Sequence, residues 1–313
     1  MQVRFLLVGN YGVGNLGDEA LKDYFLRSFP EVQWTVISAH PEDQEVPRFP
    51  MGIRSLLSLR WFRTLRALRQ SRGMVFGGGS LLTDQESVRA CFLWGLHAFV
   101  AWLYGKPYLF AFQGIGPFRT TLGERIARSV VAHAAFLSVR DPLTAERIRS
   151  WKMNTKFIQS FDPVFRLMYD KKTIVRTQKI FTVIPRASDV SQPEKYHIPA
   201  GSTVRILLLE PESLSERSLA EAIHARHPDS SILSIRTLEQ LLTEVAQATT
   251  VLSARFHGAL AAVALEKELQ LLSQGEGDKL SSLRHLPPAT ELLALVRTGE
   301  EALKTALHGI SSR

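Results

Sequence analysis

Two side chains suited to chemistry on a small anion lie two residues apart late in the chain. Arg255 and His257 occur in the run Ser253-Ala254-Arg255-Phe256-His257-Gly258, which continues a strand-like segment that begins at residue 250. A guanidinium can bind an oxyanion through two parallel hydrogen bonds, and an imidazole can take up or release a proton near neutral pH. Because both groups share one loop bordered by glycine, we expect them to act on one small anionic ligand.

Further cations follow other strand-like segments. Arg140 comes directly after residues 136–139, Arg186 follows residues 179–184, and Lys279 lies beyond a last short strand. Arginine in such positions can bind phosphate or carboxylate with its planar fork. Each residue also has a structural alternative, because strand-end arginines often form ion pairs, Arg140 stands beside Asp141, and Lys279 can equally be a surface lysine.

Special loops end the strand-like segments of the first half of the chain. They are Gly9–Leu21, Gly77–Asp84, Gln113–Pro117 and Arg140–Pro142. In a parallel sheet, the carboxyl ends of the strands lie at one edge, where such sheets bind ligands. The glycine order in the first loop matches neither G-x-G-x-x-G nor a Walker loop, so we expect no nicotinamide or Walker-type nucleotide site there. A plain turn with carboxylates at the start of a helix is the alternative for this loop.

The elements that position these loops alternate between strand and helix throughout the chain. This alternation predicts an α/β fold with parallel sheets. A polar connector around residues 169–178 separates two such series, so we expect a first Rossmann-like domain at residues 1–170 and a second at 171–289. Residues 290–313 are expected to form a closing helix.

Composition narrows the class of protein. The chain has 313 residues, 45% of them apolar, and a single cysteine, Cys91, so an internal disulfide is excluded. No C-x-x-C, H-E-x-x-H or D-x-D motif is found, and we expect no metal and no cofactor. The first residues start a strand instead of a basic leader, and the longest apolar stretch, residues 91–104, is too short to span a bilayer. We therefore expect a protein of the cytoplasm.

The net charge of +8 is concentrated in the first half, where 21 lysines and arginines stand against 14 acidic residues up to Asp170. Much of this charge lies in an arginine-rich helix at Arg60–Arg72, preceded by Arg54, with leucines and aromatics interleaved. Such a pattern is compatible with an anionic membrane surface, and a solvated helix packed on a sheet is the alternative. No recognition motif for nucleic acid accompanies the charge, so we expect no nucleic acid partner.

Together, five of these motifs resemble the polysaccharide pyruvyl transferase family, most closely its CsaB type. The resemblance covers nearly the whole chain in order. The motifs are Gly12-Val13-Gly14-Asn15-Leu16-Gly17-Asp18-Glu19-Ala20, Gly77-Gly78-Gly79-Ser80-Leu81-Leu82-Thr83-Asp84, Gln113-Gly114-Ile115-Gly116-Pro117, Val139-Arg140-Asp141 and Ser253-Ala254-Arg255-Phe256-His257-Gly258.

The resemblance implies a GT-B-like fold with two Rossmann-like domains facing a cleft, and an enzyme. Its activity would be the transfer of a carboxyethylidene group from phosphoenolpyruvate to a sugar as a cyclic ketal. The implied acceptor is a lipid-linked saccharide containing N-acetylmannosamine, a precursor of a secondary cell-wall polymer that anchors surface-layer proteins. The enzyme would then work on the inner face of the cytoplasmic membrane.

The same resemblance assigns roles to the candidate residues. His257 is the expected general acid or base, with Arg255 beside it, and Arg140, Arg186, Arg255 and Lys279 are expected to bind phosphoenolpyruvate. The family often has Asp-Pro-Lys where this chain has Gly277-Asp278-Lys279. Polar side chains of the first domain are expected to bind the acceptor; they are Asn15, Asp18, Ser80, Asp84 and Gln113.

Two other classes of function share the expected fold. One is a GT-B glycosyltransferase that uses a nucleotide sugar. The other is a non-catalytic regulator that binds saccharides or anions. Donor choice would separate the first from a pyruvyl transferase, and the effect of replacing His257 would separate the second.

Overall fold

The computed structural model describes residues 3–42, 44–85, 87–172, 179–272 and 279–312. It divides into two compact units. Unit 1 consists of Met1–Val13, Asp18–Pro163 and Thr290–Arg313, and unit 2 consists of Gly14–Gly17 and Val164–Ala289. None of the helices within the described residues combines the length and the apolar content that crossing a membrane requires.

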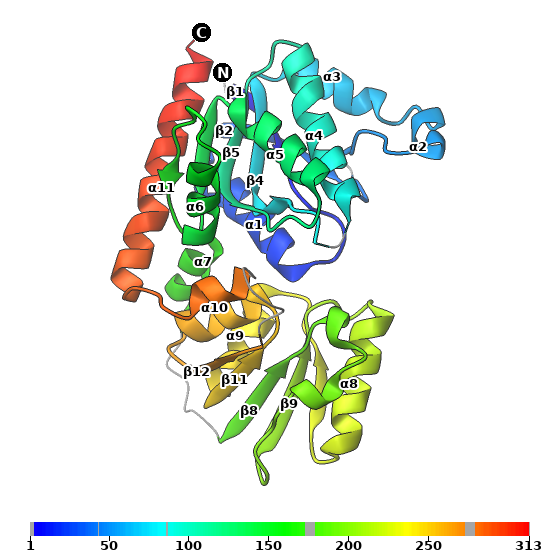
Figure 1. Cartoon of the computed structure of the whole chain (residues 1–313), viewed down its shortest axis with the longest axis vertical. Coiled ribbons are helices and arrows are strands. Elements are labelled where there is room, and N and C mark those ends of the chain that lie inside the picture. The colour runs from blue at the N-terminus through cyan, green and yellow to red at the C-terminus, as the bar shows by residue number, and fades with distance from the viewer. Residues whose placement is uncertain (1–2, 43, 86, 173–178, 273–278, 313) are drawn as a thin grey trace. The chain divides into compact units, whose positions relative to one another are not determined.

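Unit 1 is built on a sheet of seven parallel strands in the order β3-β2-β1-β4-β5-β6-β7 (Figure 1). The strands are β1 (Val3–Val8), β2 (Val32–Ser38), β3 (Val46–Pro47), β4 (Gly73–Leu82), β5 (Tyr108–Ile115), β6 (Phe136–Val139) and β7 (Ile158–Gln159). The helices are α1 (Leu16–Ser28), α2 (Ile53–Leu57), α3 (Phe62–Gln70), α4 (Val88–Leu103), α5 (Thr121–Ala132), α6 (Pro142–Ser150) and α11 (Ala289–Ser311).

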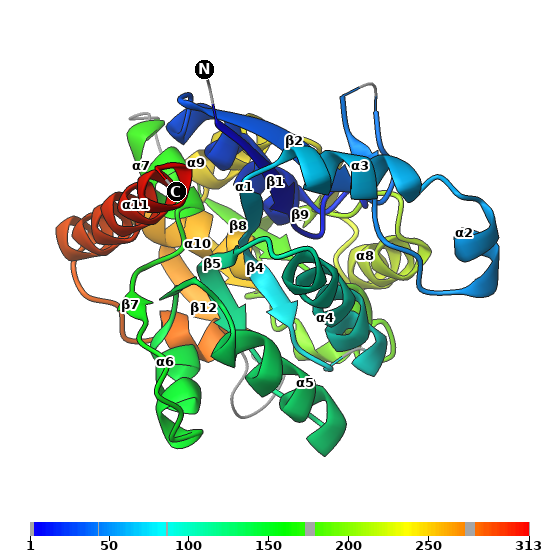
Figure 2. The same cartoon turned by 90° about the horizontal axis from the view of Figure 1, so that it is seen from above.

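Helices cover both faces of this sheet because its central strands are apolar on both sides. In β1, Leu6 and Val8 join a buried cluster with residues of α3, α4 and α5. The alternate residue Phe5 lies in an aromatic cluster on the other face, with Trp34 and the α1 rings. Since successive side chains of a strand point to opposite faces, one strand supports both cores. Figure 2 shows α3, α4 and α5 on one side of the sheet and α1 and α11 on the other.

Helix α11, near the C-terminus, packs in unit 1 on the same face of the sheet as α1 (Figure 2). Its Glu300, 7% exposed, accepts a hydrogen bond from Tyr24 Oη of α1 at 2.6 Å. Gly299 lies so close to β5 that an added Cβ would be 2.5 Å from a ring atom of Phe112. The expected closing helix of residues 290–313 is thus observed as a 23-residue helix that packs within unit 1.

Unit 2 repeats the design on a smaller scale, with a parallel sheet in the order β10-β9-β8-β11-β12. Its strands are β8 (Ile180–Ile184), β9 (Thr203–Leu208), β10 (Ser231–Ser234), β11 (Thr250–Ser253) and β12 (Glu268–Leu271). Its α-helices are α7 (Val164–Asp170), α8 (Leu214–Arg226), α9 (Leu238–Gln247) and α10 (Phe256–Ala264), and its 3₁₀ helices are η1 (Ala187–Asp189), η2 (Pro193–Lys195) and η3 (Lys279–Leu283).

The strand order reverses once in each sheet. The reversal lies between β1 and β4 in unit 1 and between β8 and β11 in unit 2. At such a point the two chain segments leave the sheet in opposite directions, which opens a crevice at the carboxyl ends of the strands. The α/β fold with parallel sheets is therefore confirmed, whereas the expectation that the two domains face one cleft stays a prediction.

The structure differs from the sequence prediction in the arginine-rich region before β4. The single arginine-rich helix is observed as two helices, α2 and α3. The break follows from the backbone at Leu59, whose φ of 55° lies in the left-handed region that a right-handed helix cannot include. The short strands β3 and β7 had no recognisable sequence pattern, because two residues are too few to show alternation.

The packing of α11 gives a first prediction. Replacing Gly299 by alanine should lower the free energy of unfolding by about 1–2 kcal/mol, because the new methyl group meets Phe112 and Ser160 in a filled core. Replacing Gly309 by alanine on the same helix should instead raise it by up to about 1 kcal/mol, since nothing lies within 4 Å there and alanine favours helix. Urea denaturation followed by circular dichroism measures both; equal effects would contradict the packing described.

Candidate functional site

The most complete cluster of charged residues in unit 2 lies at the reversal of its sheet. Pro185 and Arg186 follow β8, and Ala254 and Arg255 follow β11, after which α10 begins at Phe256. These two strands are neighbours, with Ser253 in register with Ile184. The sheet thus brings Arg186, Arg255 and the first turn of α10, which carries His257, to the same edge, as the sequence predicted for strand ends of a parallel sheet.

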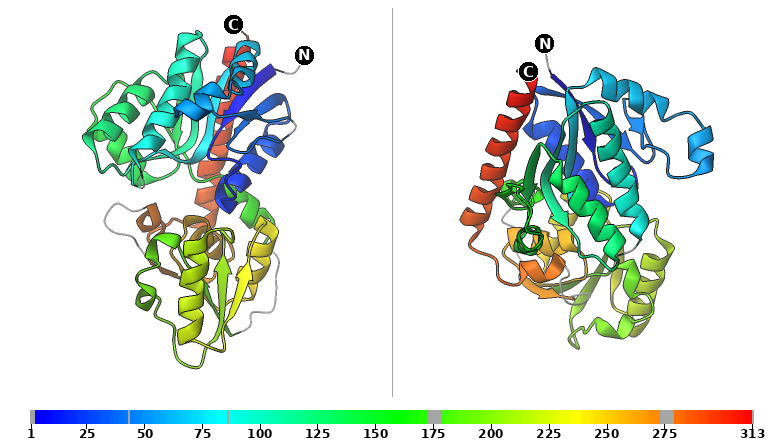
Figure 3. Two further views of the ribbon diagram at one scale, coloured as in Figure 1. Left: turned by 90° about the vertical axis from the view of Figure 1, so that its right-hand side faces the viewer. Right: turned by 45° about the horizontal axis from the view of Figure 1, so that its top comes forward.

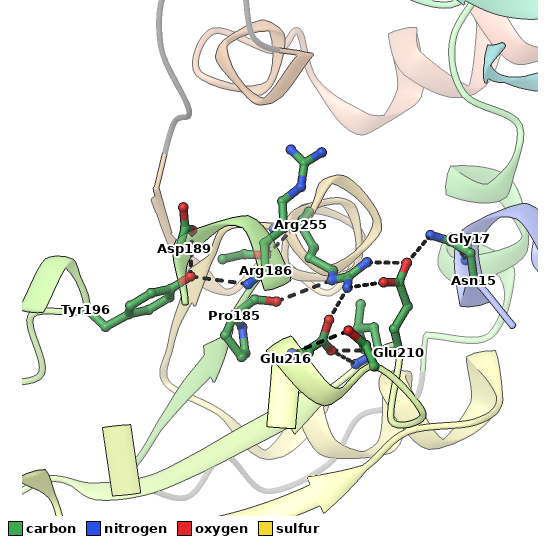
Figure 4. Close-up of polar contacts among 12 residues, drawn as sticks. Asn15, Gly17, Pro185, Arg186, Asp189, Tyr196, Glu210, Glu216 and Arg255 are labelled. Atoms are coloured by element: carbon green, nitrogen blue, oxygen red, sulfur yellow. Dashed lines mark hydrogen bonds and ion pairs between the residues drawn. The ribbon is translucent and has the colours of Figure 1, made fainter. Parts of the chain in front are cut away.

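Arg255 is held by two glutamates (Figure 4). Its Nη1 and Nη2 atoms lie 2.8 Å from Oε1 and Oε2 of Glu210, a bidentate pair, and Nη2 also contacts Oε2 of Glu216. Its Nε donates to the carbonyl of Pro185 at 3.3 Å. Burial alone would lower the pKa of Arg255, but the hydrogen bonds and charges of the two glutamates outweigh it and raise the pKa. The guanidinium is therefore a fixed cation.

The two glutamates differ in exposure. The Glu216 side chain is fully buried and also accepts hydrogen bonds from the backbone N–H groups of Leu209 and Glu210, at 2.8 and 3.0 Å. The Glu210 side chain is 31% exposed. Hydrogen bonding from Arg255 is the main cause that lowers the pKa of Glu210, and Asn15 and the charge of Arg186 act in the same direction against burial. Glu216 is thus a structural anchor, and Glu210 is the more accessible partner.

The segment Gly14–Gly17 belongs to the same cluster. Asn15 Nδ2 donates to Glu210 Oε1 at 2.7 Å, and Asn15 Oδ1 accepts from the Gly17 N–H at 3.1 Å in the first turn of α1. A Cβ built on Gly17 would be only 1.8 Å from Nδ1 of His257. Only glycine at position 17 leaves room for the imidazole, so these two segments are in direct contact. Although they are more than two hundred residues apart in sequence, Gly14–Gly17 and the segment that carries His257 form one site within unit 2.

Arg186 is partly buried and its side chain extends away from the Arg255–glutamate network in the close-up (Figure 4). Its backbone N–H donates to Tyr196 Oη at 3.2 Å, and this hydroxyl donates to Asp189 Oδ2 at 2.8 Å. Burial, followed by the charge of Asp189, raises the pKa of Tyr196, so the hydroxyl keeps its proton. These bonds fix the turn from which Arg186 projects.

Arg140 lies in unit 1 and is enclosed by the protein. It is 2% exposed, its Nη1 pairs with Asp162, and its Nη2 donates to Ser80 Oγ at 3.0 Å. An added Cβ on Gly114 would lie 2.6 Å from Ser80 Oγ and 3.2 Å from Arg140 Nε, so these side chains fill the space beside this glycine. The structural alternative considered for Arg140 is therefore present, with Asp162 and not the adjacent Asp141 as its partner.

The remaining polar candidates of unit 1 have varied surroundings. Asp84 accepts from Thr120 and from the backbone of Arg119 before α5, and these bonds lower its pKa against the effect of burial. Gln113 is fully buried and donates to the carbonyls of Phe76, Gly78 and Ala111. Asp18, which is partly buried, accepts from Asn10 at 3.1 Å and lies near the Gly79 loop. Their expected contact with an acceptor stays a prediction.

Lys279 opens the short helix η3 in unit 2 and is partly buried, with Ser282 Oγ donating to its carbonyl at 2.6 Å. The preceding Gly277 and Asp278 lie outside the described residues. The expected phosphate contact of Lys279 stays a prediction.

Sequence reasoning missed the acidic residues that complete both clusters: Glu210, Glu216, Asp162 and Asp189. Glu210 had a recognisable signal, because it stands just beyond the apolar run 204–209, at the same sheet edge as Arg255. Glu216 and Asp162 had none, since an acidic residue in the first helical turn or in a loop is usual at the surface.

The lowered pKa of Glu210 predicts a pH dependence of stability. A carboxyl with a lower pKa in the folded state stabilises it above the unfolded-state pKa, about 4.3, and loses this contribution as the pH falls through the folded-state value. Urea denaturation should therefore give wild type a constant advantage over Glu210→Gln between about pH 6 and pH 8, and a shrinking advantage below about pH 4. Glu212→Gln, which removes a 73% exposed carboxylate from the same loop, is the control and should show no such change.

Comparison with known proteins identifies the fold and the family. The chain is similar in structure to UDP-N-acetylglucosamine 2-epimerase from Rickettsia bellii, with a TM-score of 0.60, 10% identity, and coverage of 100% of this chain and 98% of that one. It is also similar to UDP-GlcNAc 2-epimerase from Methanocaldococcus jannaschii (TM-score 0.57, 10% identity, 98% and 100%) and to an alpha-glucosyltransferase solved with UDP and DNA (0.51, 10%, 96% and 90%). These neighbours have the GT-B fold.

No curated protein matched the sequence. The family of polysaccharide pyruvyl transferases matches residues 15–269, which include the glycine segment Asn15–Gly17, the strand-end residues Arg140 and Arg186, and the Arg255–His257 loop. The chain belongs to the polysaccharide pyruvyl transferase family.

Proposed function

We propose that this protein transfers a carboxyethylidene group from phosphoenolpyruvate to two hydroxyls of a sugar, forming a cyclic ketal. The observation that carries the proposal is the cluster in unit 2, where Arg186 follows β8, Arg255 and His257 follow the adjacent strand β11, and glutamates fix Arg255. Family membership supports transfer of pyruvyl. A cationic edge with one imidazole is suited to a donor that carries both a phosphate and a carboxylate.

The donor would bind through the strand-end arginines. Arg186 projects from a turn whose backbone is fixed by Tyr196 and Asp189, so its guanidinium would reach the phosphate or the carboxylate from a fixed point. Arg255 already holds one carboxylate in bidentate fashion. The carboxylate of phosphoenolpyruvate would take the place of the partly exposed Glu210, while the buried Glu216 stays on Nη2. Lys279 remains a candidate for the departing phosphate, and Arg140 would act by fixing Ser80.

The chemistry needs one group that moves protons. His257 would protonate the methylene carbon of phosphoenolpyruvate, which makes the central carbon electrophilic, and a sugar hydroxyl would attack that carbon and release its proton. The second hydroxyl would then displace inorganic phosphate and close the ring. Of the two hydroxyl protons, one replaces the proton used on the new methyl group and the other leaves with phosphate, so the reaction needs no oxidant and no external acid.

The acceptor would be a lipid-linked saccharide of a cell-wall polymer precursor, containing N-acetylmannosamine as in the CsaB type. The first turn of α1 and the end of β4 would offer Asp18 and Ser80 to sugar hydroxyls, whereas Asn15, Asp84 and Gln113 would act by fixing backbone around them. A lipid-linked acceptor would hold the enzyme at the inner face of the cytoplasmic membrane. The product would serve in anchoring surface-layer proteins.

The test is to incubate the protein with labelled phosphoenolpyruvate and lipid-linked disaccharides that contain N-acetylmannosamine. Label in an acid-labile ketal, with release of one phosphate for each ketal, supports the proposal. Calorimetric binding of a nucleotide sugar together with no binding of phosphoenolpyruvate would replace it by the glycosyltransferase alternative.

His257 gives a prediction that separates catalysis from binding. His257→Gln should lower kcat at least a hundredfold, the usual size of a lost acid–base group, and change phosphoenolpyruvate affinity little. Arg186→Gln should instead weaken phosphoenolpyruvate binding, measured by calorimetry, by about tenfold or more. Similar effects of the two variants on binding and on kcat would contradict the division of roles.

Gly17 tests whether the position of the imidazole matters. Gly17→Ala places a methyl group where His257 Nδ1 lies, so the ring must move and activity should fall at least tenfold while the protein stays folded. Gly309→Ala is the control, because nothing lies within 4 Å of a Cβ there and α11 carries none of the proposed site residues. Unchanged activity of Gly17→Ala would contradict a role for His257 in this position.

A further inference from the structure

A segment of unit 1 carries apolar side chains that are exposed to solvent. We call residues 51–60 the arm; it contains α2 and the turn before α3. Ten consecutive residues, 51–60, are exposed, and α2 has no buried residue. Ile53 and Leu57 are 77% and 71% exposed. Figure 1 and the right-hand view of Figure 3 show α2 standing clear of the rest of unit 1.

Helix α3, which follows the arm, is different. It buries Thr64 and Leu68, and Trp61 and Leu65 pack against the same core of unit 1. The apolar side of α3 is therefore already used for folding. The expectation that the Arg60–Arg72 helix itself presents apolar residues to a membrane is replaced by a different arrangement, in which α3 is the base and the arm carries the apolar residues.

The charge around the arm is of one sign. Between Val46 and Thr83 the sequence has seven arginines, no lysine and no acidic residue. Six of these arginines are exposed on the arm or on α3 and the turn after it: Arg54, Arg60, Arg63, Arg66, Arg69 and Arg72. Such a cluster of positive charges attracts an anionic surface.

A second group of exposed apolar residues lies beside α3. Phe99, Trp102 and Leu103 of α4 are 55%, 58% and 62% exposed. The two helices are joined where Arg69 Nη2 donates to Tyr104 Oη at 3.2 Å and its guanidinium lies 5.1 Å from the centre of that ring. Arginines of α3 thus stand between two apolar groups, the arm and the end of α4.

From this arrangement we infer that the arm and the end of α4 insert into the headgroup region of an anionic lipid bilayer, with the arginines of α3 on the lipid phosphates. Exposed aliphatic and aromatic side chains gain by leaving water for the acyl boundary, and guanidinium groups bind phosphate oxygens. A nucleic acid would meet the arginines but leave Ile53 and Leu57 in water, so it accounts for the charge alone. The inference rests on the surface of unit 1 and not on the proposed reaction.

Sedimentation with sucrose-loaded vesicles tests whether the arm and the end of α4 bind an anionic bilayer. The full chain should bind vesicles of equal parts phosphatidylglycerol and phosphatidylcholine at least tenfold more tightly than vesicles of phosphatidylcholine alone, and added salt should weaken the binding. Arg60→Gln with Arg66→Gln should lower the partition coefficient by about 25-fold, at about fivefold for each arginine. Ile53→Ser with Leu57→Ser should lower it at least tenfold without changing the salt dependence.

Matched controls use unit 2. Leu214→Ser removes a 79% exposed leucine from α8, and Arg226→Gln removes an exposed arginine from the same helix; neither should change vesicle binding. Thermal unfolding monitored for every variant establishes that these surface changes leave the fold intact. The inference is overturned if wild type fails to bind anionic vesicles, if the arm variant binds as wild type does, or if RNA but not vesicles binds the arginines.

Discussion

A single, partly buried guanidinium connects the ends of three neighbouring strands in unit 2. Arg255 follows β11, its Nε bonds the carbonyl of Pro185 after β8, and its Nη atoms hold Glu210 after β9. In the sheet these strands lie in the order β9-β8-β11. The segments that carry Arg186 and His257 are therefore joined through hydrogen bonds of one guanidinium. Removing one partner of such a buried pair leaves the other uncompensated, so the network fixes the shape of this edge.

Unit 1 uses the same device at the corresponding edge of its sheet. Arg140 after β6 pairs with Asp162 beyond β7 and donates to Ser80 near the end of β4. Gln113 of β5 bonds two carbonyls of β4 and so holds the glycine-rich part of this strand that precedes Ser80. Strand-end arginines thus hold loops in both units. In a site built this way, residues next to the strand-end arginine can contact a substrate, as can the arginine itself.

The sequence predicted the fold class because strand and helix periodicities are local, and it predicted that Arg186, Arg255 and His257 lie at one edge because parallel strands end together. It could not predict that Glu216 is buried, since its burial depends on packing between α8 and the sheet. Gly17 was recognised as part of a glycine loop, but its contact with His257 joins segments distant in sequence. The break at Leu59 also escaped prediction, because leucine favours helix and the left-handed backbone is set by its surroundings.

The charge of the Arg255 cluster decides how a phosphoenolpyruvate carboxylate could enter it. Two glutamates surround one guanidinium, so adding a third carboxylate would place like charges together in a partly buried site. Exchanging Glu210 for the incoming carboxylate avoids this electrostatic repulsion. Glu210, at 31% exposure, can turn toward water, where its charge is solvated, and the incoming carboxylate then accepts the same two Nη bonds. Glu216 must stay, because it is fully buried and also holds the backbone of Leu209 and Glu210. The number of ion pairs on Arg255 is the same before and after, so donor binding would draw its free energy chiefly from Arg186 and from the phosphate.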